Sequence, residues 1–308
     1  MFNEILLKKS DSGHLFIRDI NNTKRKLERF MQLNIKSLQV VSDFDRTLSK
    51  FKFNGVNNLS CYGVFEQDPE LTPLVRSKEL TKKYYPIEIN PNMPDHEKLR
   101  YMIEWWEQAH EVMIQAKLHK DCLIKTAYAA TVYLREQVPE FIQLAQLHHI
   151  PVLIFSAGLG DVIEPIMKKA NLYLNNVHIV SNFMAFNQEG LLVGFKEPLI
   201  HVFNKNIATV CEMDYYKTES SKRSCVLLCG DSTGDVHMSD GANFISEEEH
   251  ATPVENSKTT VLRIGFLNEH VEENLDRYKE IYDIVLVDDD SFDLPMLILR
   301  SMIENETV

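Results

Sequence analysis

Residues 38–49 read LQVVSDFDRTLS, in which a short apolar run ends in two aspartates one residue apart. The run LQVV at 38–41 is β-branched and bounded by polar residues, which predicts a strand buried inside a parallel sheet. Asp43 and Asp45 then follow the carboxyl end of that strand, the edge at which open α/β sheets bind ligands. The stretch therefore predicts an α/β fold that presents two carboxylates to a substrate.

The spacing of the two aspartates indicates the chemistry. In an extended chain residues i and i+2 point the same way, so both carboxylates face one side. Two such charges repel each other, which raises the pKa of one of the two carboxyl groups unless a divalent cation lies between them. Mg²⁺ fits best, because it prefers oxygen ligands and binds one or two protein carboxylates beside water and phosphate. The motif thus indicates magnesium-dependent phosphate transfer, and a solvated turn after a strand is the plainer alternative.

A second strand signal, PVLIF at 151–155, runs into the small residues SAGLG at 156–160 and then a helical pattern. Small residues at a strand-to-helix turn expose backbone amides at a helix N-terminus, where a phosphate is favoured. The backbone amides of this turn are therefore a candidate phosphate site, and an ordinary strand–turn–helix junction is the plainer alternative. The segment matches neither a Rossmann nor a Walker A loop, so it does not indicate a dinucleotide or ATP.

A third strand signal, CVLLC at 225–229, is followed by GDSTGD at 230–235. Asp231 at the strand end is a candidate third metal ligand, and Asp235 is expected to support the ligands from behind. A further segment, HVFNK at 201–205, contains Lys205, and a lysine taken singly is more often a solvated surface charge than a site residue.

The order of these motifs, D-x-D-x-T, a small hydroxyl residue, a lysine and G-D-x-x-x-D, resembles the haloacid dehalogenase-like phosphohydrolases. Longer stretches are similar to the cytosolic 5′-nucleotidase III family, and they extend over nearly the whole chain: DFDRTLSKF at 43–51, KYYPIEINP at 83–91, FSAGLGDVIE at 155–164, VSNFM at 180–184, GFKEPLIHVFNK at 194–205 and GDSTGDVHMSDG at 230–241.

The resemblance implies a magnesium-dependent 5′-nucleotidase that works through an aspartyl-phosphate. Asp43 would attack the phosphorus of a nucleoside 5′-monophosphate, while Asp45 would protonate the leaving ribose oxygen and then activate water. Mg²⁺ would be held by Asp43, the backbone carbonyl of Asp45, and Asp231. The remaining phosphoryl oxygens would be bound by Lys205, the Ser156 hydroxyl and the Ala157 amide.

The resemblance also implies where the base binds. Glu88 in KYYPIE would accept a hydrogen bond from an exocyclic amine, the alternative being a solvated acid. Trp105, Trp106 and His110 could stack on the base, although Trp106 also belongs to an apolar stripe. The family often has Ser before the histidine that matches His110, whereas this chain has Ala109. The preference between pyrimidine and 7-methylguanosine monophosphates therefore stays open.

Hydrophobic patterning predicts a doubly wound parallel α/β sheet with an inserted helical cap. Further strand signals lie at 177–181 and 283–287, and a helical pattern lies within 16–33. Helical periodicity prevails from the turn NGVNN at 54–58 to about 140, with one helix beginning near Pro94 as a first helical residue. Its predicted apolar face contains Leu99, Met102, Ile103, Trp106 and Met113. We expect a core of 1–52 and 141–308 and a substrate-selecting cap of 53–140.

The last apolar run, IVLV at 284–287, precedes three aspartates at 288–290 and mimics the first motif. It lacks the threonine of that motif and a phosphate-binding turn in the right order. We interpret it as a structural edge strand with a solvated acidic end.

Composition limits the function classes. With 308 residues, 44% hydrophobic and 25% charged, the chain fits a globular two-domain enzyme. No apolar stretch approaches the roughly 18 residues of a membrane span, and the N-terminus lacks a secretory cleavage site. Five cysteines without a C-x-x-C pair argue against a disulfide framework and a zinc site, which favours a reduced, cytoplasmic protein. The sequence does not indicate an oligomeric state, and a monomer is compatible with it.

The formal net charge of −12 disfavours nucleic acid as a partner, because phosphate backbones need clustered Lys and Arg. The positive charge for an anionic small-molecule substrate must then be local, from the metal, Lys205 and the amides after Ser156.

Three alternatives to a nucleotidase remain at this point. A receiver-type signalling domain also carries an aspartate at a strand end, but it is about half as long and has no cap. A catalytically silent binding protein would keep the residues without turnover. Another phosphatase of the same superfamily would act on a sugar phosphate or on phosphoserine.

Overall fold

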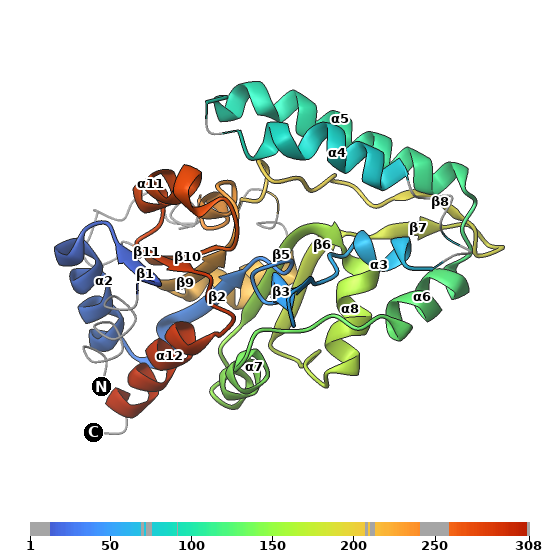
Figure 1. Cartoon of the computed structure of the whole chain (residues 1–308). Helices are drawn as coiled ribbons and strands as arrows, with labels where there is room; N and C mark the ends of the chain where they lie inside the picture. Colours follow the sequence, from blue (N-terminus) through green and yellow to red (C-terminus); the bar gives the residue numbers. More distant parts are fainter. Residues whose placement is uncertain are drawn as a thin grey trace, which may run out of the picture.

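The computed structural model describes residues 13–68, 71, 76–90, 92–206, 209, 213–240 and 259–306. These residues form a seven-stranded sheet in the order β1–β11–β10–β9–β2–β5–β6 (Figure 1). All neighbouring strands are parallel except β1 and β11. The strands are β1 (Leu15–Ile17), β2 (Leu38–Ser42), β5 (Val152–Leu159), β6 (Val177–Asn182), β9 (Cys225–Gly230), β10 (Thr260–Leu267) and β11 (Ile284–Val287).

The predicted α/β class is confirmed, and β2 lies inside the sheet as its apolar sequence predicts. Every residue of β2 is buried. In the register of the sheet, Ser42 at the end of β2 lies opposite Cys229 of β9 and Ile154 of β5. The segments that follow these three strands therefore leave the sheet at the same edge.

Two strands of the seven-stranded sheet were not among the sequence predictions. β10 carries the apolar run TVLRIGFL, and β1 is only three residues long, too short to show a period. Because β1 pairs with β11 in antiparallel register, β11 lies one strand in from the edge, and its prediction as an edge strand is wrong. Its acidic end is nevertheless solvated, with Asp288 and Asp290 exposed.

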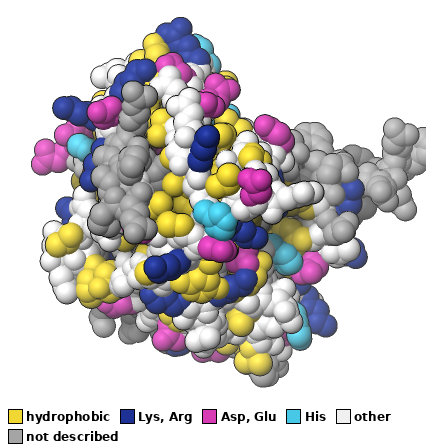
Figure 2. All heavy atoms as spheres, turned by 90° about the vertical axis from the view of Figure 1, so that its right-hand side faces the viewer, with side chains coloured by type: hydrophobic (Ala, Val, Ile, Leu, Met, Phe, Trp, Pro, Cys, Tyr) yellow, Lys and Arg dark blue, Asp and Glu magenta, His cyan; other side chains and the backbone are white. Residues whose placement is uncertain are grey.

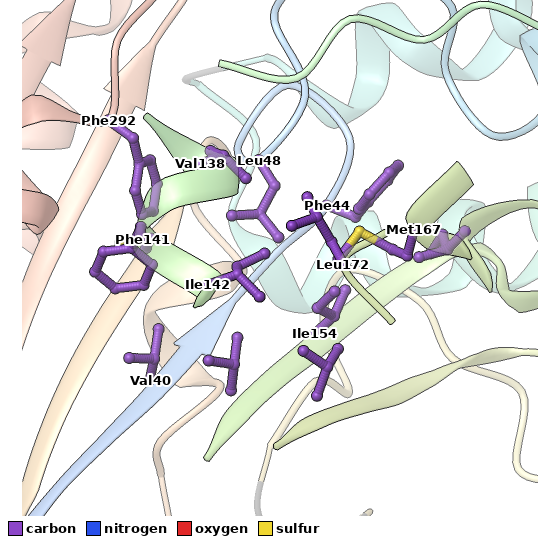
Figure 3. Packing of buried hydrophobic residues seen from close by; sticks show 14 of the residues in the cluster. Val40, Phe44, Leu48, Val138, Phe141, Ile142, Ile154, Met167, Leu172 and Phe292 are labelled. Atoms are coloured by element: carbon purple, nitrogen blue, oxygen red, sulfur yellow. The ribbon is translucent and has the colours of Figure 1, made fainter. Parts of the chain in front are cut away.

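Helices cover both faces of the sheet. One face packs against α2 (Ile20–Gln32), α7 (Val138–Leu147), α8 (Gly160–Lys169) and α12 (Asp293–Glu306). Figure 3 shows part of this layer, where Ile142 of α7 lies among Val40 of β2 and Ile154 of β5. The opposite face packs against α11 (Val271–Ile281). Each fully buried side chain of this size contributes about 1.5–3 kcal/mol to folding.

The helices α4 (Arg76–Glu88) and α5 (Asp95–Gln115) stand above the sheet and the small hairpin β7 (Met184–Phe186)–β8 (Leu192–Phe195) in Figure 1. The helices α3 (Gly63–Glu66) and α6 (Lys120–Ala129) lie below that hairpin, beside α8. α4 packs along α5, α5 contacts β8, and α6 packs on α8. The division into a core of 1–52 and 141–308 and a cap of 53–140 stays a prediction. Shorter elements are η1 (Ile35–Ser37), β3 (Lys52–Phe53), β4 (Val56–Asn57), α10 (Asp214–Thr218), η3 (Ser220–Lys222) and η4 (Asp235–His237).

Two details of α5 differ from the prediction. Pro94 is the N-cap in extended conformation, and the helix begins one residue later at Asp95. Met102 and Met113 are buried as predicted, but Leu99 is 36% exposed.

Charged side chains of both signs are interspersed on the face that Figure 2 shows, without a continuous basic stripe among the coloured residues. Among the described residues, no helix combines the length and the apolar character needed to cross a membrane.

Candidate active site

A cavity of about 270 Å³ opens where the end of β5 and the loops after β2 and β9 meet α4 and α5. Candidate residues from both sides line it. From the sheet side they are Asp43, Asp45, Ser156, Ala157, Lys205 and Asp231, and from the helical side they are Glu88, Trp105 and Trp106. The structure thus brings together residues that lie up to 188 positions apart in the chain, from Asp43 to Asp231.

Alternation along the aspartate loop explains how two acids reach one cavity. Asp43 and Asp45 both line it, whereas Phe44 between them is fully buried in the core below. Figure 3 shows the Phe44 ring packed in the same apolar layer as Leu172 and Met167. Burial of Phe44 therefore fixes the orientation of both neighbouring carboxylates.

Lys205 makes the central ion pairs of the site. Its Nζ lies 2.7 Å from Oδ1 of Asp43 and also pairs with Asp235, and all three side chains are buried. Burial lowers the pKa of Lys205, but the two carboxylates outweigh this effect and keep its pKa above the ordinary value. Lys205 is therefore a fixed cation beside Asp43.

Asp235 is held by backbone amides. Its Oδ2 accepts hydrogen bonds from the N–H groups of Asp231 (3.0 Å) and Ser232 (2.9 Å). Gly230 makes this approach possible, because a Cβ at that position would lie 2.3 Å from the Cβ of Asp235. Asp235 thus braces the loop after β9, in line with the supporting role expected for it.

Three acids could hold a metal ion. Carboxylate oxygens of Asp43, Asp231 and Asp235 lie within 4.8 Å of one another. Burial raises the pKa of Asp231 to about 7, with Asp235 adding to the effect, and burial raises the pKa of Asp43 well above its usual range. The crowded negative charge favours either protons or a cation, and an all-oxygen donor set suits a hard divalent ion.

Asp45 stands apart from this cluster. Its carboxylate accepts hydrogen bonds from the backbone N–H of Cys61, at 3.0 and 3.1 Å to its two oxygens. Burial raises the pKa of Asp45, and the hydrogen bonds from Cys61 only partly oppose this rise. A carboxyl group that tends to keep its proton is suited to general acid catalysis.

Ser156 and Ala157 lie on an irregular strand end. β5 continues to Leu159 with a shift of register after Phe155, and α8 begins at Gly160. The prediction that they occupy a turn directly at the helix N-terminus is therefore wrong, because the irregular strand separates them from the helix. The Ser156 hydroxyl accepts a hydrogen bond from the N–H of Gly158 at 3.0 Å, which orients it beside the cavity.

The helical side presents an acid and two indoles. Glu88 ends α4, where its backbone carbonyl accepts a hydrogen bond from the fully buried Lys98 at 2.7 Å. Burial raises the pKa of Glu88 to about 7, with Arg46 as the main opposing charge. Trp106 donates from Nε1 to the carbonyl of Ala157 at 2.9 Å, and its ring meets that of Trp105 edge-on, with centroids 5.0 Å apart.

His110 does not reach the cavity. Its ring stacks on Phe195 with centroids 3.5 Å apart, and Nε2 lies 3.0 Å from the Tyr62 hydroxyl. Burial lowers the pKa of His110 to about 4, so the ring is neutral. Ala109, one residue before it, lines the cavity. The structure therefore gives no support to the predicted stacking of His110 on a base.

Several polar residues that line the cavity had no role in the sequence analysis, among them Arg46, Tyr85 and Glu269. Arg46 lies inside the D-x-D-x-T motif, and this position could have identified it as a residue of the site. Glu269 follows β10, so the missed strand concealed it.

Known proteins resemble this chain over most of its length. The family model of pyrimidine 5′-nucleotidase (UMPH-1) matches residues 46–303. The 7-methylguanosine phosphate-specific 5′-nucleotidase of Homo sapiens is 40% identical over 260 residues, covering 83% of this chain and 82% of that protein. The enzyme of the same name from Drosophila melanogaster is 36% identical over 296 residues, covering 95% and 88%.

Solved structures agree as well. The crystal structure of cytosolic 5′-nucleotidase IIIB bound to cytidine superposes with a TM-score of 0.83 at 35% identity, covering 96% of this chain and 95% of that chain. A probable phosphoserine phosphatase from Vibrio cholerae, 11% identical with a TM-score of 0.50, shares the fold alone. The chain belongs to the pyrimidine 5′-nucleotidase (UMPH-1) family.

Proposed function

We propose that this 5′-nucleotidase hydrolyses pyrimidine or 7-methylguanosine 5′-monophosphates with Mg²⁺, through an aspartyl-phosphate on Asp43. The observation that carries the proposal is one cavity with chemically different residues at its sheet end and at its helical end. Acids and a buried lysine gather at the sheet end, and a carboxylate with two indoles lies at the helical end. The first end suits a phosphate, and the second suits a base.

The chemistry follows from the positions of the two aspartates. The Asp43 carboxylate attacks phosphorus, and the bond from phosphorus to the ribose 5′-oxygen breaks. Asp45 gives its proton to that oxygen, consistent with the raised pKa of its buried carboxyl. Asp45 then takes a proton from the water that hydrolyses the aspartyl-phosphate, which returns Asp43 and releases inorganic phosphate.

Three groups would bind the phosphoryl oxygens: the Lys205 ammonium, the Ser156 hydroxyl and the Ala157 amide. Asp43, Asp231 and the backbone carbonyl of Asp45 would hold Mg²⁺, and Asp235 would brace them through Lys205 and the loop amides. When bound, Mg²⁺ neutralises charge on the phosphoryl group. The three clustered carboxylates fit such an ion, because hard oxygen donors are what it prefers.

Substrate choice would depend on Glu88 and the indoles. An ionised Glu88 can accept hydrogen bonds from the amine of cytosine or of a guanine ring. The positive charge of 7-methylguanine would also be attracted by the Glu88 carboxylate and by the face of an indole. Ala109 faces the cavity without a hydroxyl, so the base contact there is apolar. The names of the relatives, some specific for 7-methylguanosine phosphate and one bound to cytidine, support both base classes.

Phosphate release from a panel of nucleoside monophosphates with Mg²⁺ tests the proposal. We expect release from 5′-monophosphates of pyrimidines or 7-methylguanosine and little from 3′-monophosphates. Preferential release from phosphoserine or a sugar phosphate would refute it in favour of another phosphatase activity. The relatives named cytosolic support a cytoplasmic location, which stays a prediction.

A further inference from the structure

We propose that Arg46 is a positioning residue that ties α4 to the aspartate loop and thereby places Glu88 for base recognition. The inference rests on the proposed function, because it concerns how that function selects its substrate. Arg46 takes no part in a chemical step. Its side chain connects the sheet end of the cavity to the helical end.

The link consists of three side chains from three separate segments. Arg46 Nη1 lies 2.8 Å from Oε1 of Glu269, in the loop between β10 and α11, and 3.2 Å from the hydroxyl of Tyr85 on α4. The Tyr85 hydroxyl also donates to the same oxygen of Glu269. Each member therefore contacts the other two, and all three line the cavity.

The backbone of Arg46 is fixed on the core. Its φ of 63° is left-handed, a conformation that a non-glycine residue keeps only where its surroundings hold it. Its N–H donates to Oγ of Ser49 at 2.9 Å, and its carbonyl accepts from Arg135 at 2.6 Å and from Asn268 at 3.1 Å. The guanidinium thus extends from a rigid base toward α4.

Placement of Glu88 follows from the geometry of α4. Tyr85 and Glu88 are three residues apart on one helix, so they share a face. A hydrogen bond that holds Tyr85 over the aspartate loop also holds Glu88 over the cavity. Lys98 fixes the same end of the helix from the other side, through the Glu88 carbonyl. The positive charge of Arg46 further opposes the rise in the pKa of Glu88.

A role in folding alone does not explain the link. The side chains of Arg46 and Glu269 are 37% and 32% exposed, and ion pairs that reach solvent add little to stability. The three residues instead border the space in which a nucleotide would bind. Their geometry therefore favours substrate selection over stabilisation of the fold.

The test compares Tyr85→Phe and Arg46→Gln with Tyr84→Phe as the matched control. The control makes the same change on the same helix. The Tyr84 hydroxyl donates a hydrogen bond to Glu104, and Tyr84 is not among the residues that line the cavity. The readout is the ratio of kcat/KM for the preferred nucleotide to kcat/KM for phenyl phosphate, which has no base. We expect both cavity variants to lower this ratio about three- to tenfold, because each variant loses its hydrogen bonds within the link.

A double-mutant cycle separates positioning from a direct effect. In a Glu88→Ala background, Tyr85→Phe should lower the ratio no further, because the group that it positions is gone. A ratio for Tyr85→Phe equal to that of the wild type, or an equal drop in both backgrounds, would overturn the proposal. A wild type without preference for nucleotides over phenyl phosphate would instead refute the proposed function.

A measurement without substrate distinguishes failure of the positioning role from failure of the proposed function. Amide hydrogen exchange across residues 76–88 should be faster in Arg46→Gln and Tyr85→Phe than in Tyr84→Phe, since the link to the core is broken. Unchanged exchange in both cavity variants would show that α4 is held without Arg46, whatever the enzyme hydrolyses.

Discussion

Replacing Lys205 with methionine should destabilise the metal-free protein strongly. Methionine keeps most of the volume but removes the ammonium that pairs with Asp43 at 2.7 Å and with Asp235. Both carboxylates are buried, and removing one partner of a buried ion pair costs about 3–5 kcal/mol. Asp235 retains its two backbone hydrogen bonds, and Asp43 can take up a proton, so we expect the lower half of this range.

The assay is urea unfolding followed by circular dichroism, in EDTA and in excess Mg²⁺. A divalent cation among the three acids would replace the lost charge, so the destabilisation should shrink when Mg²⁺ is present. Lys168→Met is the matched control, because its ion pair with Glu164 lies on the exposed surface of α8 and should contribute less than about 1 kcal/mol. A loss below about 1 kcal/mol for Lys205→Met in EDTA would refute the reasoning.

Three further predictions concern the base, its dependence on pH, and the metal. Glu88→Ala should lower kcat/KM for the preferred nucleotide about ten- to a hundredfold, the value of one charge-assisted hydrogen bond, and affect phenyl phosphate far less. Because burial raises the pKa of Glu88 to about 7, the preference of the wild type should fall as pH drops below about 7, and Glu88→Gln should remove this dependence; a pH-independent ratio would contradict it. EDTA should abolish phosphate release and Mg²⁺, but not the larger Ca²⁺, should restore it. Full activity after exhaustive chelation would contradict the proposed role of Asp231 as a ligand of Mg²⁺.

The sequence could predict those parts of the fold that a local pattern encodes. The buried strands β2, β5, β6 and β9 appear as apolar runs, and the motif residues follow them at the positions where the sheet meets the cavity. β1 could not be predicted in this way, because three residues carry no period and its pairing with β11 is a long-range contact.

Other features of the site depend on tertiary packing. Ser156 looked like part of a helix-terminal turn, but the strand continues past it with an irregular register. His110 carries the right chemistry for stacking, yet Phe195 of a distant hairpin occupies its face. The contact of Arg46 with Tyr85 and Glu269 joins segments up to 223 positions apart, and nothing in the local sequence indicates it.

The nucleophilic role of Asp43 is tested most directly by phosphate release from the preferred nucleoside 5′-monophosphate by Asp43→Asn in saturating Mg²⁺. The variant keeps the size of the side chain, but an amide cannot attack phosphorus, so the rate should fall by several orders of magnitude. Urea unfolding of the same variant should show that it is still folded. A folded Asp43→Asn enzyme that retained more than about 1% of the wild-type rate would contradict the covalent mechanism.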